Sequence, residues 1–332
     1  MNRLKKFFLF LAAFPVFGAN AQFAPQAGLP GSTAVPATSP LIKGWATQCS
    51  VTRGWKDIRD KSAGSVGLGM DSDGTGPANS YIISLGDSGV AVLQFAIPIA
   101  DGPGPDLAVF ENGFINPTNP EEAFLELAFV EVSSDGQNYF RFPALSEADT
   151  TSQIPGAGVY LDCRKYHNLA GTYRGGFGTP FDLSELPNDP LLNKSRITHV
   201  RLVDVIGSVG PEGSRDAQGR KINDPFPTPF PTGGFDLDAV AVLNDANSQG
   251  VGSTAFAAAV RVSPNPATEW LHIEISGKDF QYILRSLEGK RMTSGEATEA
   301  VQIPVSGLPK GLYFVEIKTR AGDTWREKII VQ

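Results

Sequence analysis

The sequence predicts an all-β protein, with a jelly-roll-like β-sandwich followed by a small Ig-like β-sandwich. The 332 residues include 36 Gly and 25 Pro, which favours turns and short strands over long helices. Strand-like runs also recur between clusters of Gly, Asp, Asn and Pro, without helical repeats between them. These runs span residues 81–85, 91–95, 125–132, 198–206 and 235–243. Residues 121–125 and 182–187 alone predict short helical turns.

The first 21 residues have the pattern of a secretory signal peptide. Arg3, Lys5 and Lys6 precede an apolar run of about eleven residues, and Ala19-Asn20-Ala21 supplies small residues at the cleavage positions. A membrane-spanning helix needs about 20 apolar residues, so an anchor is disfavoured. We expect export through the inner membrane and a mature chain that starts at Gln22.

Composition and charge exclude several classes of function. The formal net charge is −7, and cleavage after residue 21 removes three basic residues and no acidic ones. An acidic mature chain argues against nucleic acid as a partner, because phosphate binding needs basic surface. Three His and two Cys without ligand spacing argue against a zinc cluster. No second apolar stretch has spanning length, so we expect no transmembrane segment.

Composition shifts divide the mature chain. Residues 22–40, rich in Pro, Gly, Ser, Thr and Ala, are expected to form a flexible leader. Residues 41–244 form the predicted sandwich, residues 245–257 a small, polar linker, and residues 258–332 the terminal domain. Residues 262–332 balance nine basic against nine acidic residues, so the acidic excess belongs to the central part.

Ordered motifs make the terminal domain recognisable. It opens with Val-Ser-Pro-Asn-Pro-Ala at 262–267, contains a Gly289 turn, and continues with Gly-Leu-Tyr-Phe-Val at 311–315. This order resembles the type A C-terminal sorting domain of the type IX secretion system of Bacteroidota. The motif residues are Pro264, Asn265, Pro266, Gly289, Gly311 and Tyr313.

That resemblance implies a route and a partner. The type IX machinery would carry the chain across the outer membrane and remove the terminal domain. The mature protein would then be released, or attached to surface lipopolysaccharide. A generic adhesive Ig-like domain is the alternative.

Acidic, glycine-rich segments supply candidate metal ligands. Asp101 and Asp106 flank a Gly-Pro-Gly-Pro turn, and Asp236 and Asp238 are predicted to share one face of a late strand. Because Ca²⁺ collects six to eight hard oxygens, we expect one structural calcium ion near Asp101 and Asp106 or near Asp238. Ordinary turns are the alternative, since Asp and Gly also populate them.

The two cysteines, Cys49 and Cys163, can form a disulfide once the chain is exported. Such a bond would close a loop of more than 100 residues. Two buried thiols are the alternative, and we expect the disulfide.

Residues 160–181 supply candidate ligand-binding residues, because their aromatics lie among glycines and polar groups. An aromatic ring with adjacent donors suits a sugar ring or a flat cofactor. We expect Tyr173, Arg174 and Phe177 to contribute. The alternative is a long loop that packs on the sandwich through its own aromatics.

The central domain also has recognisable runs, at residues 84–89, 95–99, 104–114 and 130–136. They resemble a family of exported bacterial surface proteins of jelly-roll type. Some relatives lie on the surface of gut Bacteroidota and are associated with corrinoid uptake, so the resemblance keeps a corrinoid or other small ligand open.

The leading hypothesis is a non-catalytic recognition protein at the cell surface, with glycan as its ligand and no cofactor other than structural calcium. Capture of a corrinoid or another small molecule is the second, and a purely structural surface protein is a further alternative. A hydrolase using Glu126, Glu131 or His167 is disfavoured, because the sequence has no G-x-S-x-G, H-E-x-x-H or P-loop motif. In addition, the odd spacing of Glu126 and Glu131 puts them on opposite faces of one strand.

Overall fold

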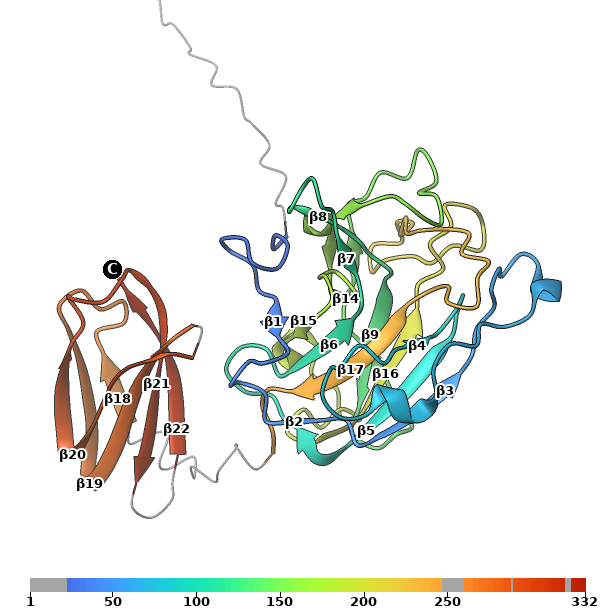
Figure 1. Cartoon of the computed structure of the whole chain (residues 1–332). Helices are drawn as coiled ribbons and strands as arrows, with labels where there is room; N and C mark the ends of the chain where they lie inside the picture. Colours follow the sequence, from blue (N-terminus) through green and yellow to red (C-terminus); the bar gives the residue numbers. More distant parts are fainter. Residues whose placement is uncertain (1–22, 247–259, 288, 320–323) are drawn as a thin grey trace, which may run out of the picture.

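The computed structural model describes residues 23–246, 260–287, 289–319 and 324–332. Two all-β domains are present, one before and one after residues 247–259 (Figure 1). The predicted signal peptide, 1–21, and most of the predicted linker, 245–257, lie outside the described residues.

Two antiparallel sheets form the central domain. The first has the order β1 (Val35–Pro36), β15 (Phe177–Phe181), β6 (Leu107–Glu111), β17 (Asp236–Val242) and β2 (Gly44–Trp45), with β4 (Ile83–Ser84) also on β17. The second has the order β10 (Phe140–Arg141), β9 (Ala128–Ser133), β16 (Ile197–Asp204), β5 (Val90–Ile99) and β3 (Gln48–Thr52), with β14 (Leu169–Ala170) on β9.

Apolar side chains between these sheets make the core. The longer strands β5, β6, β9, β15, β16 and β17 alternate between the two sheets along the chain, as in a jelly roll. Leu93, Val130 and Leu202 of the second sheet are fully buried in the same cluster as Val109 and Val240 of the first. The predicted sandwich is therefore confirmed.

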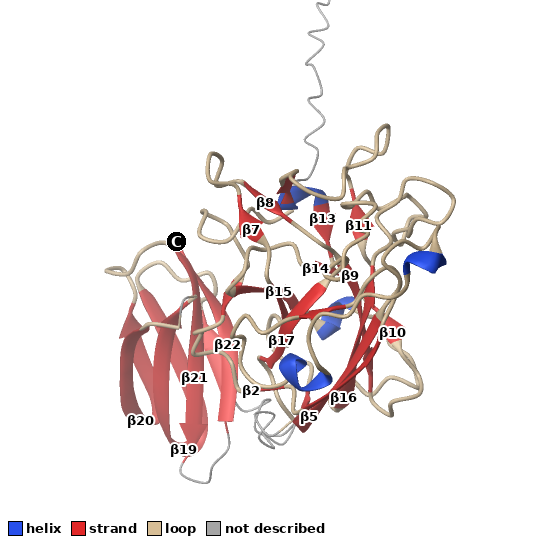
Figure 2. Ribbon diagram, turned by 45° about the vertical axis from the view of Figure 1, so that its right-hand side comes forward, coloured by secondary structure: helices blue, strands red, loops and turns tan. Residues whose placement is uncertain are grey.

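Smaller elements cover the ends of the sandwich. They include a sheet of β7 (Phe114–Ile115), β8 (Glu122–Phe124) and β12 (Leu161–Asp162), and a pair of β11 (Leu145–Ser146) and β13 (Tyr166–His167) (Figure 2). Four 3₁₀ turns are described: η1 (Lys61–Ala63), η2 (Asp71–Gly74), η3 (Cys163–Lys165) and η4 (Leu183–Glu185). The helical turn expected at 182–187 is thus present as η4, whereas residues 121–125 contain strand β8.

The segment expected to be a flexible leader, 22–40, packs on the central domain over its described residues. Val35 pairs with Gly178 as part of β1, and Ala27 is buried. The buried Gln26 side chain accepts a hydrogen bond from the Arg174 amide at 3.0 Å. The leader prediction is wrong, because strand pairing at Val35 and the buried residues Gln26 and Ala27 hold the segment on the domain. A Pro- and Gly-rich composition does not reveal such contacts.

The terminal domain folds around a long hairpin of β19 (Trp270–Ser286) and β20 (Arg291–Pro304). The first part of β19 pairs with β18 (Val260–Ser263), and its second part pairs with β21 (Gly311–Thr319), which pairs with β22 (Thr324–Val331). The pairing of β19 with β20 has a register shift between Glu274 and Asp279.

The motif residues of the terminal domain have structural roles. Asn265, between Pro264 and Pro266, accepts from the Ile330 amide at 3.0 Å and donates to the Lys328 carbonyl at 2.7 Å. This side chain therefore fastens the start of the domain to its last strand. Tyr313 donates its hydroxyl to the Pro309 carbonyl at 2.6 Å.

Both cysteines are free thiols, so the predicted disulfide between Cys49 and Cys163 is not present. Cys49 lies in β3 and packs against the sandwich core. Cys163 lies in η3 within a second apolar cluster, and its thiol donates to the Ala24 carbonyl at 3.5 Å. The two thiols do not pair because they pack in different apolar clusters. The sequence alone does not show that separation. Over the described residues, no helix is both long and apolar enough for a membrane crossing.

Candidate functional site

Three carboxylates converge at the loop between β5 and β6. Oxygens of Asp101, Asp106 and Asp182 all lie within 4.8 Å of one another. Sequence predicted the first two together, and it missed Asp182, which joins them from the end of β15 across the pairing of Phe181 with Leu107. We call these three residues the loop carboxylates.

Asp106 is the buried member of the loop carboxylates. Its carboxylate accepts from the Gly102 and Leu183 amides, both at 2.8 Å, and from the Asn244 side chain at 3.0 Å. The pKa of Asp106 is raised to about 7 despite these donors, mainly by burial and to a smaller extent by the charge of Asp182. A cation would relieve this charge crowding.

Asp238, the third predicted ligand, lies elsewhere. It accepts from the Asn79 and Ser80 amides at 3.0 and 3.1 Å. Its neighbour Asp236 instead accepts from the Ser84 hydroxyl at 2.5 Å. A register shift in the pairing of β17 with β6 falls between Leu237 and Ala239. The structure therefore does not bring Asp238 to the loop carboxylates.

The segment 160–181 is mostly packed inward. Tyr173 is buried, and its hydroxyl lies 2.9 Å from the Thr33 hydroxyl. Tyr166 is also buried and donates to the Asn223 carbonyl at 3.0 Å. Tyr173 therefore offers no open ring face to a ligand, because the residues of the segment 23–40 cover it.

Arg174 and Phe177 are half-buried and contact each other. The Arg174 guanidinium carbon lies 4.3 Å from the centre of the Phe177 ring. A backbone bridge between Arg174 and Gly113 brings this pair beside the start of β7. Of the three predicted ligand residues, two therefore border the small sheet of β7, β8 and β12.

An aromatic row crosses that small sheet. Phe114 of β7 pairs with Phe124 of β8, and Tyr160 directly precedes β12, whose Leu161 pairs with Ala123 next to Phe124. Opposed residues share one face of a sheet. Phe114 is 61% exposed, Tyr160 37% and Phe124 partly buried, whereas on the other face Ala123 and Leu161 are buried and Ile115, at the edge, is 37% exposed. The aromatic row therefore faces outward.

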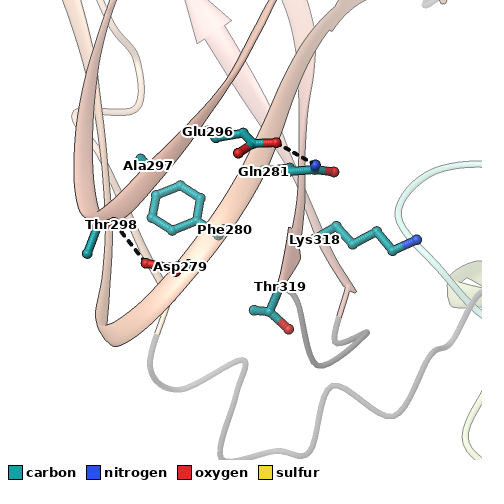
Figure 3. Close-up of a pocket in the computed structure, with 8 residues that line it drawn as sticks. All are labelled: Asp279, Phe280, Gln281, Glu296, Ala297, Thr298, Lys318 and Thr319. Carbon is teal, nitrogen blue, oxygen red and sulfur yellow. Dashed lines mark hydrogen bonds between the residues drawn. The ribbon is translucent and has the colours of Figure 1, made fainter.

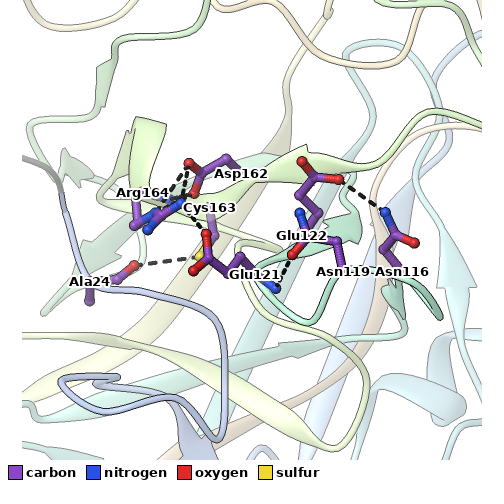
Figure 4. Close-up of polar contacts among 8 residues, drawn as sticks. All are labelled: Ala24, Asn116, Asn119, Glu121, Glu122, Asp162, Cys163 and Arg164. Carbon is purple, nitrogen blue, oxygen red and sulfur yellow. Dashed lines mark hydrogen bonds and ion pairs between the residues drawn. The ribbon is translucent and has the colours of Figure 1, made fainter.

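A polar row lies on the same face, two residues along each strand. It comprises Asn116, Glu122 and Asp162, and Asn116 donates its amide to Glu122 at 3.0 Å (Figure 4). Arg164 beside it donates to Asp162 at 2.9 Å and to Glu121 at 2.7 Å. We call the aromatic row and the polar row together the platform.

Sequence reasoning missed the platform for a physical reason. Its three strands come from segments up to 48 residues apart, and each is only two or three residues long. No period-2 pattern can be read from so few residues. The one signal was Tyr160, which belongs to the aromatic segment noted in the sequence.

The carboxylates considered for hydrolysis lie in different surroundings. Glu131 forms ion pairs with Arg141, at 2.7 Å, and with Arg201. Glu126 is buried, and burial together with nearby carboxylates raises its pKa well above the usual value. His167 lies 3.2 Å from Glu185 and stacks on Phe23. The three groups considered for hydrolysis therefore have different partners: Glu131 and His167 form separate pairs, and Glu126 lies in the interior.

A groove of about 430 Å³ lies in the terminal domain (Figure 3). Its polar lining is internally paired, since Gln281 donates to Glu296 and Thr298 donates to Asp279, both at 2.8 Å. The remaining lining residues are Phe280, Ala297, Lys318 and Thr319.

Comparison with known families identifies the terminal domain. Residues 261–332 match the secretion system C-terminal sorting domain. The chain is therefore a substrate of type IX secretion, which delivers it to the cell surface or the extracellular space. The type IX machinery is accordingly its partner, as the motifs at 262–267 and 311–315 predicted.

Other comparisons add little about the central domain. No curated protein matches the chain. Among solved structures, β-glucuronidase from Ruminococcus gnavus was found with a bound N1-substituted uronic isofagomine and in the apo form, each at 13% identity and a TM-score of 0.23. The alignments cover 87% of this chain and 46% and 45% of those chains. The chain thus spans less than half of those enzymes, and similarity at that TM-score carries no argument.

Proposed function

We propose that the central domain is a non-catalytic glycan-recognition domain that type IX secretion delivers to the cell exterior. The platform is its binding surface, and the loop carboxylates hold a structural calcium ion. After removal of the sorting domain, the mature protein is released or attached to surface lipopolysaccharide.

The exposed aromatic row is the observation that carries this proposal. Phe114 and Phe124 are paired on adjacent strands, and Tyr160 directly precedes the third strand, with Phe114 the most exposed of the three. Sugar rings have an apolar face that packs on aromatic rings, and hydroxyls that need acceptors and donors at the edge. The polar row and Arg164 supply both kinds of group on the same face. A row on fixed strands also loses little freedom on binding.

The calcium proposal rests on the ligand chemistry of the loop carboxylates. Asp101, Asp106 and Asp182 offer three carboxylates within one coordination sphere, and Ca²⁺ favours oxygen ligands of flexible geometry. Binding there would clamp the β5–β6 loop to the end of β15. We assign the ion a stabilising role, because the platform lies on different strands.

A non-catalytic role fits the surroundings of the candidate acids. Glu131 is held by two arginines, and none of the groups considered for hydrolysis belongs to the platform. A glycosidase needs one carboxyl to donate a proton and a second to act as base or nucleophile at the same sugar bond, whereas the platform's own acids, Glu122 and Asp162, already accept from Asn116 and Arg164. We therefore assign recognition without cleavage to the platform.

Binding of the full mature chain to a glycan array and to insoluble polysaccharides tests the proposal. The wild-type protein is expected to retain one glycan class, and the double variant Phe114→Ala/Tyr160→Ala to bind it at least tenfold more weakly. Cobalamin joins the panel because the central domain resembles surface proteins associated with corrinoid uptake.

A matched control uses two other exposed aromatics, Tyr81 and Phe230, which are 68% and 48% exposed on separate loops. The variant Tyr81→Ala/Phe230→Ala should bind like wild type. Equal losses in both double variants, or binding of cobalamin and no glycan, would overturn the platform assignment. Release of reducing sugar from the bound glycan would overturn the non-catalytic role.

A further inference from the structure

Five acidic side chains gather inside the central domain, away from the loop carboxylates. They come from the end of β6, the segment before β9, the end of β16, the loop before β17 and the start of β17. None is more than 7% exposed. These residues, the inner carboxyl cluster, are Glu111, Glu126, Asp204, Asp224 and Asp236.

Backbone and hydroxyl donors satisfy only part of the inner carboxyl cluster. Both carboxylate oxygens of Asp204 have a hydrogen-bond donor, the Phe235 amide at 2.7 Å and the Ser88 amide at 3.2 Å. Glu111 accepts from the Gly113 amide through one oxygen, at 2.7 Å. Asp236 accepts from Ser84 through one oxygen. Among the described side chains of the cluster, the fully buried oxygen left without a partner is on Asp224.

Asp224 gives the sharpest sign of a missing partner. Its Oδ2 accepts from the Leu127 amide at 2.9 Å, but its Oδ1 is fully buried and has no hydrogen-bond partner among the described residues. The residue is 3% exposed. An unsatisfied buried carboxylate oxygen costs several kcal/mol in general, so a native fold rarely leaves one without a ligand.

No basic side chain balances this charge within the described part of the chain. The ion pairs there involve other carboxylates, such as Glu131 with Arg141 and Asp216 with Arg220. Burial is the main cause that raises the pKa values of Glu111, Glu126 and Asp224; other acids of the cluster raise those of Glu111 and Glu126 further, and Asp87 raises that of Asp224. The cluster must therefore hold protons or a cation, because several uncompensated buried anions cannot coexist.

We propose that a divalent cation, Ca²⁺ by its ligand chemistry, binds between Glu111, Glu126, Asp224 and Asp236. These four side chains supply only oxygen ligands, the set that calcium prefers over the nitrogen and sulfur of zinc sites. Asp224 Oδ1 is the buried ligand atom that has no other partner among the described residues. In that part of the chain only the loop carboxylates bring three oxygens within 4.8 Å of one another, so calcium binding would draw the four inner side chains closer together.

Such a site would link the two sheets of the sandwich. Glu111 and Asp236 belong to the first sheet, whereas Glu126 leads into β9 of the second sheet. A cation between them joins both sheets at one end of the core. Calcium is abundant outside the cell, where type IX secretion delivers the chain. The site would therefore fill on export, independently of any glycan.

Calcium titration of the EGTA-treated full mature chain tests this proposal. Isothermal titration with Ca²⁺ should show one bound ion fewer in Glu126→Gln and in Asp224→Asn than in wild type, or at least a tenfold weaker dissociation constant for that ion. The control variant Asp101→Asn/Asp182→Asn should keep the ion, because it alters only the loop carboxylates. Mg²⁺ serves as a second probe and should bind more weakly.

Thermal unfolding separates ligation from a merely structural role. In EGTA, both inner variants should melt above wild type at neutral pH, because an amide is neutral at that position without having to bind a proton. Adding calcium should raise the melting temperature of these variants by less than it raises that of wild type. The proposal would be overturned if wild type and the inner variants bound the same number of calcium ions and showed the same rise in melting temperature; the cluster would then be neutralised by protons. A wild-type chain that binds no calcium would overturn it as well. Glycan binding, measured on the same proteins, reports separately on the platform.

Discussion

Asp87 should make the stability of the central domain depend on pH. Its side chain is 3% exposed in the loop between β4 and β5, and it accepts from the Ile58 amide at 2.7 Å. Burial is the main cause that raises its pKa from 3.8 to about 6. The unfolded chain loses this proton near pH 4, whereas the folded chain keeps it until about pH 6.

The sign and size of the effect follow from proton linkage. Between pH 4 and pH 6 the unfolded state binds fewer protons than the folded state, so stability falls as pH rises and levels off above pH 6. The shift corresponds to at most about 3 kcal/mol at ~1.4 kcal/mol for each pKa unit. Asp87→Asn keeps an acceptor for the Ile58 amide and removes the titration. Its stability should therefore decline less between pH 4 and pH 7.

Urea unfolding in EGTA at several pH values measures this difference. The free energy of unfolding of Asp87→Asn, relative to wild type, should rise by roughly 1–3 kcal/mol from pH 4 to pH 7. Asp71→Asn is the control, because it makes the same charge change at an exposed side chain. A relative stability of Asp87→Asn that is constant with pH, or that falls, would refute the reasoning.

Two further predictions concern the thiols and the sorting domain. A thiol titration without reductant should find two thiols in the urea-unfolded chain, and slow reaction of both in the native chain, because burial raises the pKa of Cys49 and of Cys163 to about 12; finding no thiols would instead show a disulfide. Asn265→Ala should destabilise the sorting domain by about 1–2 kcal/mol, through loss of its hydrogen bonds to Ile330 and Lys328. Thermal unfolding of the full chain measures this, with the exposed Gln302→Ala as control, and equal melting of the two variants would contradict it.

Sequence predicted the parts of the fold that have long periodic patterns. The runs at 91–95, 198–206 and 235–243 became β5, β16 and β17, because apolar runs that contain β-branched residues and are bounded by turn residues predict strands, whether one face is buried or, as in β17, both. The sorting domain was recognisable because several motifs recur in a fixed order. Asn265 shows why the order matters, since its side chain ties the first motif to the last strand.

The candidate sites depended on contacts that sequence does not contain. Asp182 joins Asp101 and Asp106 only because β15 pairs with β6, and the spacing of these residues along the chain carries no sign of it. Tyr173 belongs to an aromatic segment but turns inward under the residues near Thr33. Local composition could not show which rings of that segment would be covered.

The inner carboxyl cluster is the extreme case of this limit. Glu111 and Asp236 are 125 residues apart in sequence, yet β6 and β17 pair so that Leu237 lies opposite Glu111. An acidic residue within a strand-like run is normally expected to face solvent. Their burial became visible only with the paired sheets.

Hydrogen–deuterium exchange of the full mature chain, with and without a bound glycan from the array, tests the platform most directly. Slower exchange is expected in peptides that cover β7, β8 and β12, residues 113–124 and 160–164, because the sugar would shield those edges. Protection centred on the loops that carry Tyr81 and Phe230, with residues 113–124 unchanged, would contradict the assignment of the platform as the recognition surface.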